Sequence, residues 1–475
     1  MSEIEVVSPI DSSVVAILVE TAPADVQRVV HAARAARPAW ARVPVEERAA
    51  VLDRWADAVL AAGDEIAAAV TREMGMPMAL ARATQVDLVA TVLRSTAAIA
   101  RGFAWTQKHD GFEVHHVPAG VVAAITPWNM PVYQCATKLA PALVAGCAVV
   151  LKPSELAPTA ATRFVELGLQ AGVPAGVLGL VHGYGPTAGE TLVTADGVDV
   201  VSFTGSGAAG ARVGSLAAAA IRRVALELGG KSASIVLDDA DLDDVLPRAV
   251  RAAFLNTGQA CNAPTRLLYP RAEQARVEAA AVATLADLRI GDPTLDGTDL
   301  GPLVSVRQHE RVAGFIGRAL ADGARVVAGA APTPPGVRST VSYSSRSGGH
   351  PADGFVLPPP YIAPVVLGDV ARHAEIAREE VFGPVLVLLP YDDDADAIAV
   401  ANDTDYGLSA EVWGSDPARI AAVASELRVG QVKVNGVRTR SRAGAPFGGF
   451  GRSGVGRELG EWGLLEFCEV RAVLA

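Results

Sequence analysis

Between residues 121 and 226 the sequence alternates short apolar runs with longer amphipathic segments, and this alternation limits the possible folds more than any other feature. Parallel strands need a crossover connection, which is usually a helix, and strands covered by helices on both faces are apolar throughout. We therefore predict a parallel α/β sheet. Its expected strands are 121–125, 148–151, 177–181, 198–203 and 223–226, and its expected helices are 130–145, 159–171, 186–194 and 208–220.

The regions on either side of this series add a helical N-terminal part and a second α/β domain. The helical spacing of apolar residues predicts a helix capped by Asp25, a helix that Pro44 opens and Gly63 ends, and helices over 66–74 and 78–100. Residues 112–117 change period and predict a strand. Residues 330–354 are rich in Pro, Gly and Ser, so we expect a mobile surface loop there. The second series of strands is expected near Ser234, Arg266, Arg325, Ile362, Val385, Ala410 and Val432.

Composition and charge exclude several classes of protein. The chain of 475 residues has a net charge of −11 and no long basic run, so nucleic acid and anionic membranes are not expected partners. No apolar run reaches ~18 residues, and the N-terminus lacks the apolar core and basic flank of a signal peptide. The scattered cysteines and histidines form no disulfide framework and no metal spacing. We expect a cytoplasmic protein without a metal site.

A candidate nucleophile lies in the segment Asn256-Thr-Gly-Gln-Ala-Cys261-Asn-Ala-Pro264, between an amphipathic segment and a strand-like run. This composition predicts an irregular loop on a rigid base, where reactive side chains are often placed. The reactive form of cysteine is the thiolate, which needs a positive or dipolar environment near pH 7. The alternative is a buried structural cysteine.

A glycine-rich turn, Phe203-Thr-Gly205-Ser-Gly207-Ala-Ala-Gly210, follows an expected strand and enters an expected helix. This is the context of a dinucleotide fingerprint, in which glycines let the backbone approach a pyrophosphate at a helix N-terminus. The next strand ends in Glu227, which the usual form of that motif would assign to the ribose hydroxyls. The alternative role of the glycines is close packing of helix on strand.

Cys261 shares the chain with Pro127-Trp-Asn129 and Glu227-Leu-Gly-Gly-Lys231, and with these motifs the sequence resembles the NAD(P)-dependent aldehyde dehydrogenase superfamily. The resemblance covers nearly the whole chain, with matching motifs in matching order. It implies that Cys261 is the nucleophile, Glu227 the general base and Asn129 a donor to the oxyanion. It also implies that Lys138 and Glu458 pass a proton outward. Without the resemblance, Lys138 reads as an exposed helix lysine and Glu458 as an acid at a helix N-terminus.

The resemblance implies that NAD is the cofactor, with NADP also possible. The residues that would hold it are Thr126, Pro127, Trp128, Lys152, Ser154, Glu155, Gly185, Gly189, Phe203, Thr204, Gly205, Ser206, Gly210, Leu228, Gly229, Glu380 and Phe382. Alternative interpretations remain for three of them: Trp128 as a packing residue, Glu155 as the start of a turn, and Glu379 in place of the adjacent Glu380 as the inward carboxylate. The residues that would face the substrate are Met130, Tyr133, Thr137, Arg440, Ser441 and Phe447.

The implied fold is α/β, with a Rossmann-like cofactor domain, a catalytic domain and a small bridging sheet element. The expected bounds are 1–99 and 118–229 for the first, 230–465 for the second, and 100–117 with 466–475 for the third. In the family this third element joins subunits, so a homodimer or homotetramer is expected. The loop 330–354 looks longer than is usual in the family.

The implied reaction is oxidation of an aldehyde to a carboxylic acid with NAD(P)⁺, through a cysteine thiohemiacetal and a thioester. One alternative is an enzyme that passes the thioester to coenzyme A, although such relatives generally lack the glutamate. The other is a non-catalytic scaffold that binds the cofactor.

The Pro446-Phe-Gly-Gly motif is preceded by three arginines, Arg438, Arg440 and Arg442. An arginine side chain can bind a carboxylate through two parallel hydrogen bonds. This predicts an aldehyde with an anionic far end, unless these arginines are solvated or paired with acids.

Overall fold

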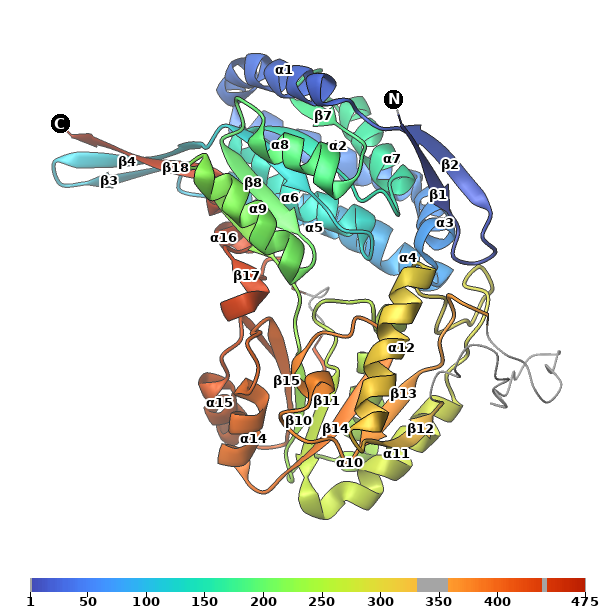
Figure 1. Ribbon diagram of the computed structural model, residues 1–475. Helices are drawn as coiled ribbons and strands as arrows, with labels where there is room; N and C mark the ends of the chain where they lie inside the picture. Colours follow the sequence, from blue (N-terminus) through green and yellow to red (C-terminus); the bar gives the residue numbers. More distant parts are fainter. Residues whose placement is uncertain (1, 331–357, 438–441, 475) are drawn as a thin grey trace.

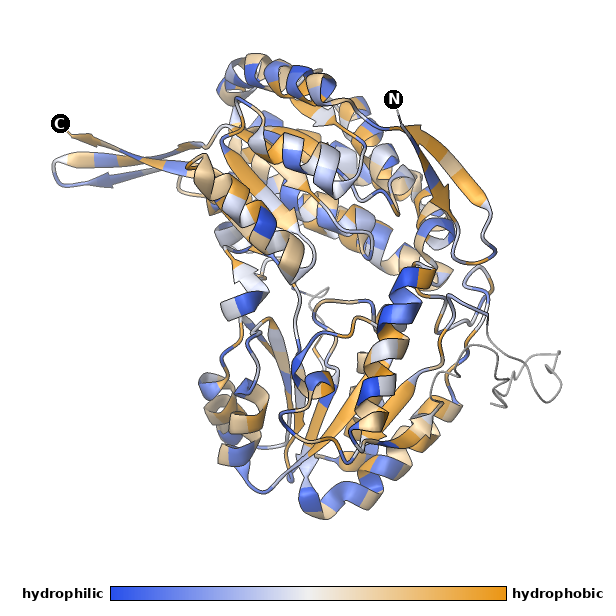
Figure 2. Ribbon diagram, viewed as in Figure 1, coloured by the Kyte–Doolittle hydropathy of each residue, from blue (hydrophilic) through white to orange (hydrophobic). Residues whose placement is uncertain are grey.

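The computed structural model describes residues 2–330, 358–437 and 442–474 of the chain. These residues form two α/β lobes and a narrow β arm that projects from the first lobe (Figure 1). Apolar residues line the strands of both lobes, while the covering helices mix apolar and polar positions (Figure 2). The predicted α/β class is therefore confirmed. The predicted loop at 330–354 lies almost wholly outside the described residues.

The first lobe is built on a sheet of six strands in the order β17-β9-β8-β5-β6-β7. All neighbours are parallel except β17, which runs antiparallel to β9. The strands are β5 Val121–Ile125, β6 Ala148–Lys152, β7 Leu178–Leu180, β8 Val200–Thr204, β9 Arg223–Glu227 and β17 Gly454–Val455. The chain leaves β5 toward β6 on one side and returns to β8 on the other. The carboxyl ends of β5 and β8 therefore border a topological switch point, where ligands bind in open α/β sheets.

Helices cover both faces of this sheet, because its central strands are buried along their whole length. The helices that follow its strands are α6 Pro131–Ala145, α7 Thr159–Gln170, α8 Glu190–Thr194 and α9 Gly207–Ala219, with a π turn at η2 Gly185–Gly189. The N-terminal helices are α1 Pro23–Arg42, α2 Val45–Ala61, α3 Gly63–Met74, α4 Met78–Arg82 and α5 Leu88–Gly102, and a π turn, η1 Ala83–Asp87, joins the last two.

The second lobe contains a sheet of seven strands in the order β12-β13-β14-β11-β10-β15-β16, antiparallel only between β12 and β13. Its strands are β10 Ala233–Val236, β11 Arg266–Pro270, β12 Arg325–Gly329, β13 Val365–Gly368, β14 Val385–Tyr391, β15 Ser409–Trp413 and β16 Gln431–Val434. Its helices are α10 Leu242–Ala253, α11 Gln274–Ala286, α12 Val306–Ala321, α13 Glu375–Arg378, α14 Asp394–Asn402 and α15 Pro417–Glu426, with 3₁₀ turns η3 Leu255–Gly258, η4 Arg271–Glu273 and η6 Gly451–Ser453. The chain then returns to the first lobe at β17, and α16 Gly460–Leu465 follows.

The projecting arm is a three-stranded antiparallel sheet in the order β18-β4-β3. It consists of β3 Thr106–His109, β4 Phe112–Pro118 and β18 Cys468–Leu474. Strands β4 and β18 pair along their whole length, with Leu474 opposite Phe112 and Glu469 opposite Val117. Strand β3 and a hairpin of β1 Glu3–Val7 with β2 Val14–Val19 were not expected from the sequence.

Two predicted helix ends are wrong. Asp25 lies in the first turn of α1, and the N-cap position belongs to Ala22, whose side chain forms no cap. Asp25 still faces the positive end of the helix dipole, where an acid is favourable. Gly63 does not end α2: the C-cap is Ala62, and Gly63 is the first residue of α3.

Helix α7 is capped from another helix by a buried carboxyl, Glu73 of α3. Its oxygens accept hydrogen bonds from the backbone N–H groups of Thr159 (2.7 Å) and Ala160 (3.3 Å). Burial raises the pKa of Glu73 from 4.5 to about 7, against the lowering effect of these bonds. The charged form is therefore disfavoured in the folded protein relative to the unfolded chain.

This pKa predicts a specific pH dependence of stability. The folded pKa of Glu73 lies above the unfolded value, so the contribution of this group to the free energy of unfolding is fully present below pH 4.5 and is lost as the pH rises through 7. The contribution of this group is on the order of 3 kcal/mol. Glu73→Gln should flatten the dependence between pH 5 and ~8, as measured by urea unfolding at several pH values. Glu65→Gln, on the exposed side of the same helix, is the matched control. An unchanged profile in Glu73→Gln would contradict the assignment.

Candidate active site

The nucleophile loop is held in a strained conformation. Helix α10 ends at Ala253, and Asn256, Thr257 and Gly258 then adopt φ values of 53°, 56° and 72°. The left-handed region costs a non-glycine residue roughly 1–3 kcal/mol, so other contacts must hold the first two residues. Asn256 Nδ2 donates to the carbonyl of Gln259 at 3.2 Å, and Thr257 Oγ1 donates to another backbone carbonyl. A Cβ at Gly258 would lie 2.1 Å from a carbonyl oxygen, so this position requires glycine.

Cys261 follows this loop and is partly buried. Burial, with smaller contributions from Glu380, Glu227 and Glu458, raises the pKa of its thiol to about 12, while Lys433 acts to lower it. With this pKa the thiol is protonated near neutral pH. The thiol needs a base that removes its proton during the reaction.

Glu227 is the final residue of β9 and is 3% exposed. Neither of its carboxylate oxygens has a hydrogen-bond partner among the described residues. Burial raises the pKa of Glu227 well above 4.5, and Glu458 raises it further, while Lys138 and Arg457 lower it. A buried carboxyl of raised pKa is suited to general base catalysis near neutral pH. A Cβ at Gly448 would lie 2.7 Å from Glu227 Oε1, which explains why the Pro446-Phe-Gly-Gly segment needs glycine there.

Lys138 and Glu458 form a buried ion pair with a separation of 2.6 Å between Nζ and Oε1. The lysine side chain is 1% exposed and also donates to Ser202 Oγ at 3.2 Å. The interpretation of Lys138 as an exposed helix lysine is therefore wrong. Glu458 is fixed by two backbone hydrogen bonds with Phe447, each 2.7 Å long. Both charges lie close enough to Glu227 to affect its pKa.

Asn129 comes just before α6 and is 5% exposed. Its Nδ2 donates to the carbonyl of Gln259 at 3.0 Å, and its own carbonyl accepts from Asn256 Nδ2 at 3.2 Å. These bonds tie Asn129 directly to the loop that carries Cys261. A side-chain amide has two N–H groups, so a second donor remains for a ligand.

Residues proposed to hold the adenosine end of the cofactor meet at the carboxyl end of β6. Lys152 ends β6, and its Nζ donates to Glu155 Oε2 at 3.3 Å. A Cβ at Gly189 of η2 would lie 3.8 Å from the Lys152 side chain, so this loop borders the same site. Burial lowers the pKa of Lys152, while Glu155 raises it. An ammonium beside a carboxylate can bind ribose hydroxyls, so these side chains fit a dinucleotide.

The glycine-rich turn enters α9, and Ser206 caps that helix by accepting from the N–H of Ala209 at 3.3 Å. A Cβ at Gly207 would meet no atom within 4 Å, so the helix N-terminus is open to an anion. At Gly210 a Cβ would lie 2.3 Å from the side chain of Leu228. Gly207 therefore fits the phosphate interpretation, whereas Gly210 serves close packing of the helix.

The two adjacent acids Glu379 and Glu380 point to different partners. Glu380 Oε1 accepts from the N–H of Gly230 at 3.1 Å, and burial raises the pKa of Glu380 to about 7. Glu379 instead accepts from the hydroxyl of Tyr406 at 3.3 Å. Phe382 has a φ of 60° and lies edge-on to Trp128, with 5.4 Å between ring centroids. Trp128 therefore packs, and it does so within the candidate nicotinamide site.

The candidate substrate residues differ in how they are placed. Met130 and Tyr133 are partly buried and pack, like Cys261, against the core of the first lobe. Thr137 is buried, and its hydroxyl donates to the carbonyl of Gln134 at 3.1 Å. Phe447 is buried as well. Arg440 and Ser441 lie outside the described residues.

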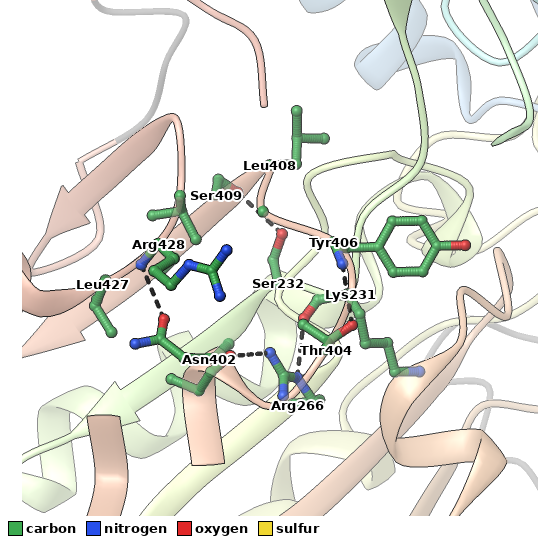
Figure 3. Close-up of a pocket in the computed structure, with 15 residues that line it drawn as sticks. Lys231, Ser232, Arg266, Asn402, Thr404, Tyr406, Leu408, Ser409, Leu427 and Arg428 are labelled. Carbon is green, nitrogen blue, oxygen red and sulfur yellow. Dashed lines mark hydrogen bonds between the residues drawn. The ribbon is translucent and has the colours of Figure 1, made fainter. Parts of the chain in front are cut away.

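Figure 3 shows a small cavity in the second lobe, beside the segment that follows Glu227. Its volume is about 10 Å³, room for roughly one water molecule. The guanidinium of Arg266 fills one side and donates at 2.9, 2.9 and 2.7 Å to the carbonyls of Lys231, Val400 and Ala401. No candidate catalytic residue lines the cavity, so it is a packing feature of the second sheet.

Among the described residues no group of histidine, cysteine and acidic side chains could hold a metal ion. Within the same residues, none of the helices is both long and apolar enough to span a membrane.

Two positioning residues near the site were not recognised from the sequence. Gln85 is fully buried and bonds to the start of α6. Arg457 donates to the carbonyl of Gly456 at 2.6 Å and to that of Gly449 at 3.2 Å, and so braces the turn against Glu227. A glutamine inside an apolar helical pattern was the available signal for the first, and the motif containing Glu458 was the signal for the second.

The chain is similar to known proteins over nearly its whole length. The model described as the aldehyde dehydrogenase family matches residues 1–473. A 3-succinoylsemialdehyde-pyridine dehydrogenase of a Pseudomonas species is 41% identical over 473 residues, 99% of this chain and 95% of that protein. Betaine aldehyde dehydrogenase 2 of Rhizobium meliloti is 36% identical over 474 residues, 99% of this chain and 94% of that protein. A solved structure of an aldehyde dehydrogenase C mutant of Pseudomonas syringae with NAD⁺ and octanal is similar with a TM-score of 0.92 and 42% identity, over 100% of this chain and 93% of that one.

Proposed function

Because the chain belongs to the aldehyde dehydrogenase family, we propose that the site described above oxidises an aldehyde to a carboxylic acid with NAD⁺. The observation that carries the assignment is the convergence of three segments. The partly buried thiol of Cys261 lies in the loop after α10. The buried carboxyl of Glu227, which has no hydrogen-bond partner among the described residues, ends β9. The amide of Asn129, just before α6, is hydrogen-bonded to the loop that carries the thiol. Relatives of this family with NAD⁺ bound support the choice of cofactor.

In the proposed mechanism Glu227 takes the proton of the Cys261 thiol, and the sulfur attacks the aldehyde carbon. The Asn129 amide and the backbone N–H of Cys261 donate to the oxyanion of the thiohemiacetal, which stabilises its charge. NAD⁺, when bound, supplies the acceptor for the hydride that leaves the aldehyde carbon. Glu227 first passes the thiol proton on to Lys138 and Glu458 and is ionised again. It then takes a proton from a water molecule, whose oxygen attacks and hydrolyses the thioester on Cys261. Lys138 and Glu458 carry that proton away from the site.

The proposal is tested by NADH release with a panel of aldehydes, followed by identification of the product. The acid should form without coenzyme A, which separates this function from an acyl-CoA-forming enzyme. If no aldehyde gave NADH, the non-catalytic scaffold would be supported instead.

The panel includes a carboxy-aldehyde and an aliphatic aldehyde of equal length. The preference for an anionic far end stays a prediction, because Arg440 lies outside the described residues.

We also propose that the arm of β3, β4 and β18 joins copies of the chain into a homodimer or homotetramer. The apolar side chains of Val470 and Leu474 on β18 are 66% and 81% exposed. Exposed apolar side chains on an edge strand promote aggregation unless another protein surface covers them. The bridging element expected at 100–117 and 466–475 includes all of β18 and most of the arm. The domain bounds and the cytoplasmic location stay predictions.

A preference for NAD over NADP is expected from Glu155. Its carboxylate can accept hydrogen bonds from both ribose hydroxyls and would repel a 2′-phosphate, although the neighbouring Lys152 moderates the effect. Glu155→Gln should lower kcat/KM for NAD by ~10- to 100-fold, which is the usual effect of losing hydrogen bonds to a charged group. The ratio of kcat/KM for NAD to kcat/KM for NADP should therefore fall. Glu166→Gln, which removes an exposed charge on α7, is the matched control. A wild-type preference for NADP would remove this role from Glu155.

A further inference from the structure

The first turn of α6 is capped by a residue from a different helix. The helix begins with Pro131, which has no N–H group, and the side chain of Met130 at the N-cap position forms no cap. The backbone N–H groups of Val132 and Tyr133 therefore need an acceptor from elsewhere. Both donate to Oε1 of Gln85, each at 3.1 Å. A single side-chain oxygen thus satisfies both free donors at the start of α6.

Gln85 lies on the π turn η1, between α4 and α5, and is fully buried. Its Nε2 donates to Thr84 Oγ1 at 3.1 Å and contacts the sulfur of Met130 at 2.9 Å. The two N–H donors of α6 require the oxygen of this amide to face the helix, so its orientation is fixed by its partners. Irregular π turns are often found at functional sites, where they redirect a side chain.

Asn129 comes immediately before this turn and is held from both sides. The nucleophile loop holds its side chain and its carbonyl through Gln259 and Asn256, at 3.0 and 3.2 Å. The start of α6, which Gln85 fixes, holds the backbone that follows it. An oxyanion donor must sit within a few tenths of an ångström of its productive position, so both supports affect catalysis.

We propose that Gln85 is a positioning residue that aims the Asn129 amide at the oxyanion by fixing the first turn of α6. This inference rests on the role proposed above for Asn129. Gln85 also holds the thioether of Met130, so it fixes one wall of the candidate substrate site as well. Glu73 caps α7 in a similar way, which shows that caps between helices recur in this lobe. Of these two caps, the one on α6 directly follows a candidate catalytic residue, Asn129.

The test is a double-mutant cycle between Gln85 and Asn129, read as kcat/KM with saturating NAD. Gln85→Leu removes the acceptor and should lower kcat/KM by ~10- to 100-fold, with most of the loss in kcat. Gln85→Glu keeps an acceptor for both N–H groups and should restore most of the activity. In the Asn129→Ala background Gln85→Leu should have little further effect, because the group it positions is absent. If Gln85→Leu does not fold, Gln85→Asn withdraws the same oxygen and should act in the same direction.

The control is Asp416→Ala, which removes the N-cap of α15 in the second lobe and should lower Tm without changing kcat. If the fold-loss in kcat/KM of the double variant equals the product of the losses of the two single variants, Gln85 and Asn129 act independently. That result would overturn the inference and leave the proposed function intact. Loss of Tm in Gln85→Leu with unchanged kcat/KM would overturn it as well. If Asn129→Ala alone had no effect, the role of Asn129 and the inference built on it would both be wrong.

Discussion

Cys261→Ser is expected to abolish NADH release, with a loss on the order of 10⁴-fold or more, the scale found when an acyl-transfer enzyme loses its nucleophile. A serine hydroxyl in the same place ionises far less readily than the thiol, whose pKa burial already raises to about 12. A base that can deprotonate the thiol is therefore too weak for the hydroxyl. The measurement is steady-state NADH production with the best aldehyde of the panel.

Two further observations sharpen this prediction. Cys147→Ser is the matched control, because Cys147 is buried and its sulfur donates to the carbonyl of Phe467, a bond that serine can keep. Turnover should survive in this variant. Iodoacetamide should label one thiol per chain, since Cys261 is the only cysteine that is not buried, and all four cysteines lie in the described part of the chain. Near-native turnover in Cys261→Ser would show that the thiol is not the nucleophile.

Glu227→Gln is expected to separate the two halves of the reaction. The glutamine cannot take a proton from water, so the thioester should accumulate and steady-state turnover should fall by ~10²- to 10⁴-fold. NADH should appear as a burst of about one equivalent per chain, as for a covalent intermediate that is not hydrolysed. The burst should also be slow near neutral pH, because the raised pKa of Cys261 leaves the thiol without its base.

The pH dependence of this variant gives a second check. In the wild type the rate should rise with pH through the raised pKa of Glu227, because only the ionised carboxylate accepts a proton. In Glu227→Gln that rise should be lost, and the burst should instead become faster at alkaline pH as the thiol ionises. Glu379→Gln, which removes an acid bonded to Tyr406, is the control. Unchanged turnover in Glu227→Gln would refute the assignment of Glu227 as the base.

The sequence by itself determined the central sheet of the first lobe, because its central strands are buried along their whole length and are therefore apolar at most positions. Val121–Ile125 is a strand with the expected bounds, and the other four strands lie within two residues of theirs. The strands Thr106–His109 and Glu3–Val7 were not predicted. The first is polar and exposed along its whole length. The second alternates exposed residues with the buried Ile4 and Val6, the pattern of a half-buried strand, over only five residues.

The candidate catalytic residues followed from motifs, since reactive side chains and glycines in a fixed order are visible in the sequence. Their charge states and partners were decided only by the tertiary structure. Lys138 reads as a surface lysine until the fold buries it against Glu458, 320 positions away along the chain. The raised pKa values of Cys261 and Glu227 and the contact of Gln85 with α6 arise in the same way. Burial and Coulomb interactions depend on distances through folded space, and no local sequence pattern records those distances.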